Sequence, residues 1–250
     1  AWRMYASLGR ERLAATMGSV HDMSDQPVSI ARVAELVRAH FSRPRGPAPK
    51  LIAVTGSVAV GKSTFANAVG AELARVTGQS AEVVATDGFL RSEPDLEAVG
   101  LLERKGFPES YDAARFASFL SEIARGAPSL HVPVYSHRTR AADEARTLAL
   151  PDWLLIEGVY VVQAIRAAGM AAFTIFLHAQ PEDVRAWYFA RRRTLRAAGA
   201  DHDALDVLAL RAWEDTNVPN LEKHIAPQRT HADLVVEKAA DHALVRIRRG

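Results

Sequence analysis

The sequence of 250 residues contains no cysteine, which excludes disulfide bonds and thiolate metal sites but leaves the cellular compartment open. It also lacks any apolar run approaching the ~20 residues that a membrane-spanning helix needs, so no membrane partner is expected. The first residues do not have the charged-then-apolar layout of a secretory signal. A cytoplasmic location is therefore the simplest expectation.

An excess of charge of one sign is absent too. The chain has 31 Lys and Arg against 29 Asp and Glu, a net charge of +2. Basic clusters at residues 191–193 and 246–249 are short, and no basic stripe is interleaved with the aromatic side chains. We therefore expect the arginines on solvated faces and no nucleic-acid partner. A hydrophobic content of 48% over this length is sufficient for one substantial core, with or without an appendage.

One glycine-rich stretch stands between two regular patterns. Residues 51–55 are apolar and β-branched, which predicts a buried parallel strand. Residues 65–76 carry apolar side chains at helical spacing. The turn between them satisfies G-x-x-x-x-G-K-[ST] in the strand-to-helix context that supports a nucleotide-binding P-loop. The predicted nucleotide-binding residues here are Gly56, Ser57, Val58, Ala59, Val60, Gly61, Lys62, Ser63 and Thr64.

The residue types of this loop suit phosphate chemistry. Gly56 and Gly61 let the backbone turn tightly, so that its N–H groups point inward around a phosphate. The N-terminus of the following helix adds further free N–H groups. Lys62 would reach the β- and γ-phosphates, and the Ser63 hydroxyl would ligate Mg²⁺. The alternative is a plain strand-to-helix turn with an exposed lysine, but the complete motif favours ATP or GTP.

Strand and helix patterns alternate along the rest of the chain. Further strands are expected over residues 82–86, 130–134, 153–157, 173–177 and 232–237. Helices are expected over residues 28–41, 113–124, 161–168, 181–198 and 203–215, whereas residues 91–112 and 217–223 are expected to be loop-rich or polar. This order predicts an α/β P-loop NTPase fold with a doubly wound, mostly parallel sheet, whose ligands gather at the carboxyl ends of the strands.

Two carboxylates close predicted strands beside the P-loop. Glu157 ends an apolar strand, as the acidic residue of a Walker B segment does, and is expected to hold Mg²⁺ directly or through water. Asp87 would accept the proton of a substrate hydroxyl and aim its oxygen at the γ-phosphate. The alternatives are a solvated strand-end carboxylate and a turn aspartate before Gly88. Together the two acids predict a kinase that acts on a small-molecule hydroxyl.

Other polar residues are ambiguous when taken singly. Tyr188 and Arg191 are three apart on a predicted helix and share a face. Arg191 above the P-loop would neutralise charge on the transferring phosphoryl group, although a run such as residues 191–193 more often forms a solvated face. Three further residues are individually typical of structural roles: Tyr135, His137 and Asn217.

Composition divides the chain near residue 50. Residues 42–49 are dense in Pro and Gly, as linkers are. We expect residues 1–49 to form an N-terminal extension with a helix and a Pro-rich linker, and residues 50–250 to form the P-loop kinase domain. The role of residues 1–28 stays open.

Several short blocks occur in a fixed order beside the P-loop. They are Thr86-Asp-Gly-Phe-Leu90, Arg104-Lys-Gly-Phe-Pro-Glu-Ser-Tyr-Asp112, Pro133-Val-Tyr-Ser-His137, Ile156-Glu-Gly158, Trp187-Tyr188, Asn217 with Asn220-Leu221, and Ala240-Asp-His-Ala243. Together they resemble the signature blocks of the bacterial type I pantothenate kinase family, in the uridine kinase and phosphoribulokinase branch of P-loop kinases. Several independent motifs in one order are far more specific than a P-loop alone.

The resemblance implies ATP-dependent phosphorylation of the primary hydroxyl of pantothenate, giving 4′-phosphopantothenate for coenzyme A synthesis. It implies Asp87 as the base, with Lys62 and Arg191 stabilising the phosphoryl group. It assigns Mg²⁺ to Ser63 and Glu157, and it places His242 near the adenine. The implied substrate-binding residues are Asp87, Tyr135, His137, Tyr188, Arg191 and Asn217. Because the family is dimeric, a homodimer is expected.

Three departures from the family pattern bear on substrate and regulation. The family folds a Phe- and Tyr-rich insertion over pantothenate, whereas residues 195–210 here contain no Phe, Tyr or Trp. Tyr160 stands where the family has Asn, and Asn67 replaces an Arg that contacts coenzyme A, which predicts weak feedback inhibition. The alternatives are a related kinase for a nucleoside, sugar or pantothenate-like compound, and a regulatory nucleotide-binding protein. The presence of both Asp87 and Glu157 disfavours the regulatory alternative.

Overall fold

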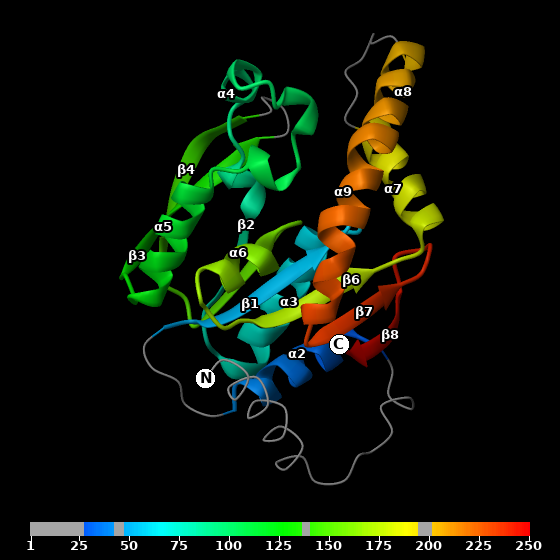
Figure 1. Cartoon of the computed structure of the whole chain (residues 1–250). Coiled ribbons are helices and arrows are strands. Elements are labelled where there is room, and N and C mark those ends of the chain that lie inside the picture. The colour runs from blue at the N-terminus through cyan, green and yellow to red at the C-terminus, as the bar shows by residue number, and fades with distance from the viewer. Residues whose placement is uncertain (1–27, 43–47, 137–140, 195–201) are drawn as a thin grey trace, which may run out of the picture.

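A six-stranded sheet in the order β2-β5-β1-β6-β7-β8 forms the centre of the molecule (Figure 1). In this computed structural model, residues 28–42, 48–136, 141–194 and 202–250 are described. The parallel strands are β1 (Lys50–Gly56), β2 (Ala81–Ala85), β5 (Trp153–Glu157), β6 (Phe173–His178) and β7 (Leu234–Lys238). The edge strand β8 (Leu244–Arg249) runs antiparallel to β7. The sheet is therefore mostly parallel, as predicted.

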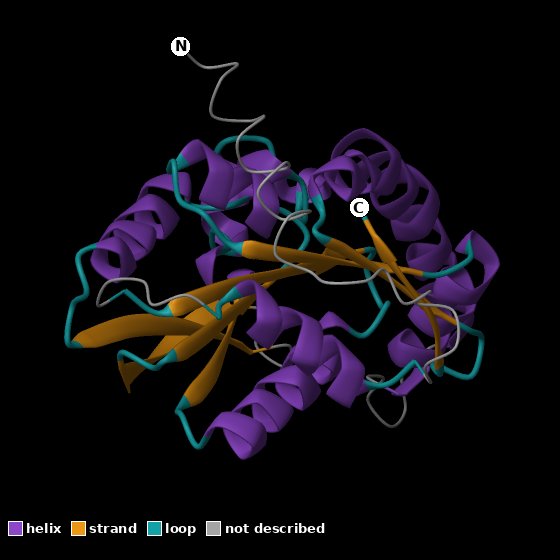
Figure 2. Cartoon of the chain, turned by 90° about the horizontal axis from the view of Figure 1, so that it is seen from below, coloured by secondary structure: helices purple, strands orange, loops and turns teal. Residues whose placement is uncertain are grey.

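The sheet is covered by helices on both faces (Figure 2). Side chains of β1 alternate between two cores, with Ile52 and Val54 in one and Leu51 and Ala53 in the other. The first core includes α2 (Ile30–His40), α3 (Lys62–Thr77) and α7 (Pro181–Thr194). The second includes α5 (Ala113–Ala124) and α6 (Val161–Ala167). Burial on both faces explains why β1 and β5 are continuous apolar runs, and the doubly wound prediction is confirmed.

The strand order reverses direction at β1. From β1 the chain adds β2 and β5 on one side and then β6 and β7 on the other. Such a switch point leaves a crevice at the carboxyl end of the strand, where ligands bind in open α/β sheets. The P-loop leaves β1 at this point.

Two strands, β4 (Ala141–Ala149) and β8, were not expected from the sequence. Strand β4 pairs with the expected strand β3 (Ser129–Ser136) in a separate antiparallel sheet, and β8 closes the edge of the main sheet. Both unexpected strands have mainly exposed or half-buried side chains, and Leu148 is a buried residue of β4. Their alternation is therefore too weak to be detected locally, and partner strands determine their conformation.

Residues 217–223, predicted only as a polar segment, are helical. These residues belong to a continuous C-terminal helical segment, residues 202–231, which starts with α8 (His202–Arg211) and includes α9 (Val218–Asn220). Wider π-helical turns, Ala212–Asn217 and Leu221–Ile225, flank α9. Pro219 lacks an N–H and crowds the preceding turn, and a wider turn accommodates it. Residues 91–112 also contain a short helix, α4 (Glu93–Ala98).

Helix α2, which belongs to the expected N-terminal extension, packs into the same core as α3. Val33 and Val37 are fully buried there together with Phe65 and Leu73. The expected helix 181–198 is described as far as Thr194, and residues 195–201 lie outside the described part. A division of the chain at residue 50 stays a prediction.

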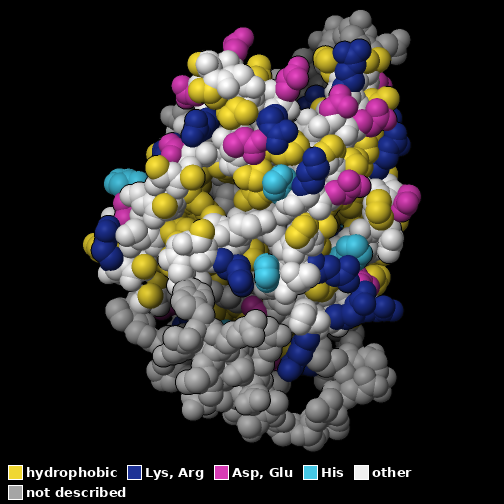
Figure 3. Space-filling model, viewed as in Figure 1, with side chains coloured by type: hydrophobic (Ala, Val, Ile, Leu, Met, Phe, Trp, Pro, Cys, Tyr) yellow, Lys and Arg dark blue, Asp and Glu magenta, His cyan; other side chains and the backbone are white. Residues whose placement is uncertain are grey.

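None of the described helices is both long enough and apolar enough to cross a bilayer. On the face shown in Figure 3, acidic and basic side chains are interspersed. Two arginines of β8, Arg246 and Arg248, are paired with Glu237 of the neighbouring strand. These arginines therefore lie on a solvated face, as expected, and in addition pair with a neighbouring carboxylate.

Candidate active site

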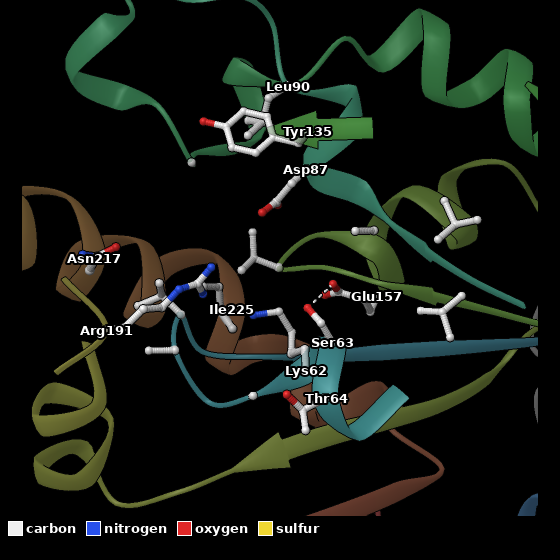
Figure 4. A pocket seen from close by; sticks show the side chains of 18 of the residues that line it. Lys62, Ser63, Thr64, Asp87, Leu90, Tyr135, Glu157, Arg191, Asn217 and Ile225 are labelled. Carbon is white, nitrogen blue, oxygen red and sulfur yellow. Dashed lines mark hydrogen bonds between the residues drawn. The ribbon is translucent and has the colours of Figure 1, made fainter. Parts of the chain in front are cut away.

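A cavity of about 970 Å³ opens at the carboxyl ends of the central strands. Its size is within the range of small-molecule sites. The predicted residues Lys62, Asp87 and Arg191 point into it from three different elements (Figure 4). The predicted site residues that line it are Val58, Ala59, Gly61, Lys62, Ser63, Thr64, Asp87, Tyr135, Glu157, Arg191, Asn217 and His242.

The P-loop backbone requires glycine at both ends. Gly56 has φ +145°, and a Cβ there would lie 2.5 Å from the backbone oxygen of Leu177 in β6. Gly61 has φ +86°, and its Cβ would lie 2.9 Å from Lys238 Nζ. Gly61 also caps α3, whose first N–H groups have no intrahelical acceptor. Ser57 is buried, and its Oγ has no hydrogen-bond partner among the described residues. The loop is a donor-rich cradle that fits a phosphate group.

Lys62 is the first residue of α3 and lies inside this loop. Its Nζ donates a hydrogen bond to the backbone oxygen of Ser57, at 2.8 Å. Burial lowers the pKa of Lys62, and the carboxylates of Glu157 and Asp87 oppose that effect. The ammonium group is therefore held between two acids, where it can meet a phosphate oxygen.

Glu157 and Ser63 are in direct contact. The Ser63 hydroxyl donates to Glu157 Oε1 at 2.6 Å (Figure 4), and Glu157 is only 5% exposed. Burial raises the pKa of Glu157, against the lowering effects of Lys62 and of the Ser63 hydrogen bond. Two adjacent oxygen donors fit Mg²⁺, which usually takes one or two carboxylates together with substrate phosphates. Within the described residues there is no cluster of three or more His, Asp or Glu that could hold a metal without phosphate.

Asp87 is positioned by close contacts on both sides of it. It lies in a 3₁₀ turn, Thr86–Phe89, at the end of β2. A Cβ on Gly88 would come within 2.1 Å of the backbone oxygen of Pro133, and a Cβ on Gly158 within 1.7 Å of Thr86 Oγ1. The turn is thus pressed against β3 on one side and against the end of β5 on the other. These contacts hold the Asp87 carboxylate over the P-loop (Figure 4).

His242 and Trp187 form a flat pair at the cavity wall. Their rings stack at 4.1 Å with an angle of 23°, and Trp187 Nε1 donates to the backbone oxygen of Ala240 at 3.0 Å. Burial, followed by the charge of Lys238, lowers the pKa of His242, which favours a neutral imidazole at neutral pH. His242 and Ala59 have φ of +68° and +59°, the two positive values among the described non-glycine residues, and both line the cavity. Such strain concentrates at functional sites.

Two predicted substrate residues are not in this group. Tyr188 is 8% exposed and packs in the core, with its ring centroid 5.3 Å from that of Trp213. The neighbouring Trp187 faces the cavity instead. His137 lies outside the described residues.

Several residues that the structure places at the site had no role assigned to them from the sequence. Lys238 Nζ donates to the backbone oxygen of Val60 in the P-loop at 2.9 Å, and burial lowers its pKa. Lys238 ends β7, so the rule that identified Asp87 and Glu157, a polar residue at the carboxyl end of a strand, would have found it. Lys105, Tyr111, Arg146 and Asn220 also line the cavity. Arg146 had no local signal because β4 itself was not expected.

A doubly wound sheet, a P-loop after β1 and two strand-end carboxylates define the class of P-loop kinases. Residues 51–245 match the model of the phosphoribulokinase/uridine kinase family. A pantothenate kinase of Sorangium cellulosum is 40% identical over 82% of this chain and 73% of its own length. A pantothenate kinase of Mycolicibacterium vanbaalenii is 38% identical over 87% of this chain and 76% of its own.

A solved structure is similar as well. A protein from Silicibacter sp. TM1040, provisionally described as a fructose transport system kinase, superposes with a TM-score of 0.65 at 26% identity, over 80% of this chain and 95% of its own. The chain belongs to the phosphoribulokinase/uridine kinase family and, within it, to the bacterial type I pantothenate kinases. It is an ATP-dependent kinase with a small-molecule substrate.

Proposed function

We propose that this protein transfers the γ-phosphoryl group of ATP to the primary hydroxyl of pantothenate, giving 4′-phosphopantothenate. The observation that carries this proposal is that Lys62, Asp87, Glu157 and Arg191 meet in one cavity of a chain 40% identical to a pantothenate kinase. Their charges suit the in-line displacement of a phosphoryl group, which depends mainly on positioning and electrostatic stabilisation.

Asp87 and the two cations have complementary roles in this proposal. Asp87 accepts the proton of the acceptor hydroxyl and orients its oxygen toward the phosphoryl group. Lys62 and Arg191 face the same space and stabilise negative charge on the phosphoryl oxygens (Figure 4). Tyr135 lies beside Asp87 and Asn217 lies on the Arg191 side of the cavity (Figure 4), and both provide polar groups for the acid substrate. His137 has the same proposed role, and Tyr188 supports the site from the core.

The nucleotide and metal roles rest on the P-loop. Residues 56–64 surround the phosphates, and His242 contacts the adenine. Ser63 and Glu157 hold Mg²⁺ together with phosphate oxygens. When bound, Mg²⁺ neutralises charge on the β- and γ-phosphates. A homodimer, a cytoplasmic location and the lack of a nucleic-acid partner stay predictions.

A kinase for another small hydroxyl compound is the second candidate. It is favoured by the absence of Phe, Tyr and Trp from residues 195–210 and by the 26% identity to the Silicibacter protein. Coupled ADP release with Mg-ATP, measured across pantothenate, pantetheine, uridine, cytidine, ribose and fructose, decides between the two. We expect saturable turnover on pantothenate with kcat/KM of about 10⁴ M⁻¹s⁻¹ or more. Turnover on another acceptor alone would contradict the pantothenate assignment.

A further inference from the structure

A buried polar bridge joins three segments that are distant in the sequence. The Tyr160 hydroxyl donates a hydrogen bond to Asn220 Oδ1, and Asn220 Nδ2 donates to the backbone oxygen of Gly106 at 2.7 Å. Tyr160 and Asn220 are only 8% and 5% exposed. Tyr160 directly precedes α6, Asn220 ends α9, and Gly106 lies in the loop before the 3₁₀ turn Pro108–Ser110.

The bridge ties together two walls of the cavity. Lys105 and Gly106 line one wall, and Asn217, Asn220 and Ile225 line the other. Asn217 and Ile225 are on the C-terminal helical segment, on the Arg191 side of the cavity (Figure 4). Asn217 and Ile225 belong to the two π-helical turns, a rare geometry that is frequent at functional sites.

The chemistry of the bridge fixes the orientation of the Asn220 amide. The backbone oxygen of Gly106 can only accept, so the NH₂ group of Asn220 must face it. The remaining amide oxygen then faces Tyr160, which must donate. Burial raises the pKa of Tyr160 well above its ordinary value, so the hydroxyl keeps its proton. The Asn220 amide thus bonds Tyr160 through its oxygen and Gly106 through its nitrogen, and it links the two walls of the cavity.

The Tyr160 ring adds an aromatic backing behind this wall. It meets the Tyr111 ring edge-on at 5.5 Å and the His224 ring at 6.0 Å, and His224 meets Phe107 at 5.8 Å. Tyr111 lines the cavity. The ring of Tyr160 therefore packs behind a residue of the cavity wall.

We propose that Tyr160 is a positioning residue for the acceptor: through Asn220 it holds the 105–106 loop and the Asn217 wall at a fixed separation. This inference rests on the proposed phosphorylation of a small hydroxyl compound. It concerns acceptor binding, because the hydrogen bond and ring contacts of Tyr160 within the described residues go to Asn220, Tyr111 and His224 rather than to the P-loop or Asp87.

The test is a double-mutant cycle with Tyr160→Phe, Asn220→Ala and the double variant. Tyr160→Phe keeps the ring and leaves a buried amide oxygen without its donor, so we expect KM for pantothenate to rise about tenfold. We expect KM for ATP to change less than about twofold and kcat less than about threefold, because the phosphoryl machinery is not touched. Since Tyr160 acts through Asn220, the double variant should be no worse than Asn220→Ala.

A control variant and a second measurement make the test decisive. Thr77→Val is the control: it removes a hydroxyl that donates to the backbone oxygen of Leu73 at 2.6 Å. Thr77 lies at the opposite end of α3 from the P-loop, so both KM values should stay unchanged. The second measurement is amide hydrogen exchange, which does not require an active enzyme. In Tyr160→Phe, exchange in residues 103–107 and 214–225 should be faster than in the wild type.

Unchanged exchange, equal effects on both KM values, or additive effects of the two single substitutions would each overturn the proposal. If the wild-type protein turns over a different acceptor, the pantothenate assignment fails. The same cycle measured with that acceptor then decides the role of Tyr160 independently.

Discussion

At the scale of single residues, two carboxylates at strand ends have different chemistry because their surroundings differ. Glu157 is buried, bonded to Ser63 and close to Lys62, which suits a metal ligand. Asp87 is only partly buried and faces the open cavity (Figure 4), which suits proton exchange with a substrate. Both predictions below follow from this difference.

Asp87→Asn should retain nucleotide binding and reduce turnover by ~10²-fold or more, because the amide cannot accept the hydroxyl proton. Mg-ATP titration and steady-state kinetics measure the two effects separately. Glu97→Gln, an exposed change in α4, is the matched control and should behave as the wild type. Turnover retained in Asp87→Asn would remove Asp87 from the base role.

Glu157→Gln should abolish most activity and yet stabilise the ligand-free protein at neutral pH. Burial raises the pKa of Glu157 above its ordinary value of 4.5. Its contribution to the free energy of unfolding is thus fully present below the ordinary pKa and is lost as pH rises through the raised value. Glutamine keeps an oxygen for the Ser63 hydroxyl, and Asp87 remains to balance Lys62. We expect Tm to increase by about 2–4 °C at pH 7.5.

The pH dependence of this gain is the check. It should shrink as pH falls through the raised pKa of Glu157, because Glu157 itself then becomes protonated. Thermal unfolding of both proteins between pH 4.5 and 8 measures it. A variant no more stable than the wild type at pH 7.5 would show that the ionised carboxylate does not cost stability.

At the scale of elements, the position of Asp87 depends on how closely three strands approach one another. Strands β2 and β5 are hydrogen-bonded neighbours, with Ala85 opposite Glu157, and β3 crosses the turn that follows β2. The backbone at Gly88 and Gly158 has no room for a Cβ. Neither glycine has a positive φ, so replacing it with alanine tests only whether there is room for a Cβ.

Gly158→Ala should reduce kcat by about tenfold or more, because its Cβ displaces Thr86 and with it the Asp87 turn. Gly88→Ala should act in the same way through Pro133. Gly126→Ala provides the control: its φ of +67° strains the backbone, but a Cβ there meets nothing within 4 Å. That control should lose stability but not turnover. Unchanged kinetics in Gly158→Ala would show that the turn tolerates displacement.

At the scale of the whole molecule, helix α2 joins the N-terminal region to the core of the sheet. Val37→Asp places a charge among fully buried side chains and should lower the free energy of unfolding by about 3 kcal/mol or more. The neighbouring Arg38→Ala is exposed and should have little effect. Urea unfolding measures both. A small effect of Val37→Asp would support an independent extension ending at residue 49.

Regulation by coenzyme A is expected to be weak. Asn67 stands where the family has an Arg that contacts coenzyme A, and its amide donates to the backbone oxygen of Ser63 at 2.8 Å on an exposed face of α3. An amide supplies no charge for a phosphate, so inhibition should be slight. Asn67→Arg should strengthen it. Inhibition of the wild type at low micromolar coenzyme A, competitive with ATP, would contradict this prediction.

Much of the fold could be read from local patterns because the signals were strong. The strand 153–157 and the helix 113–124 were predicted with the bounds that the structure has, since each has a clear apolar pattern. The P-loop was equally clear, because glycine spacing and a following helix occur within a few residues. Edge strands β4 and β8 gave weak signals because most of their side chains face solvent.

The sequence by itself determined the class of the fold, the P-loop and the strand-end acids, because these depend on periodicity and spacing within short stretches. Only the tertiary structure decided that Trp187 faces the cavity while Tyr188 faces the core, and that residues 217–223 are helical. Only the tertiary structure showed the hydrogen bonds from Lys238 to the P-loop backbone and from Tyr160 to Asn220. The physical reason is that these contacts are long-range. Lys238 and Val60 are 178 positions apart in the sequence, and Tyr160 and Asn220 are 60 positions apart, so no local preference can specify them.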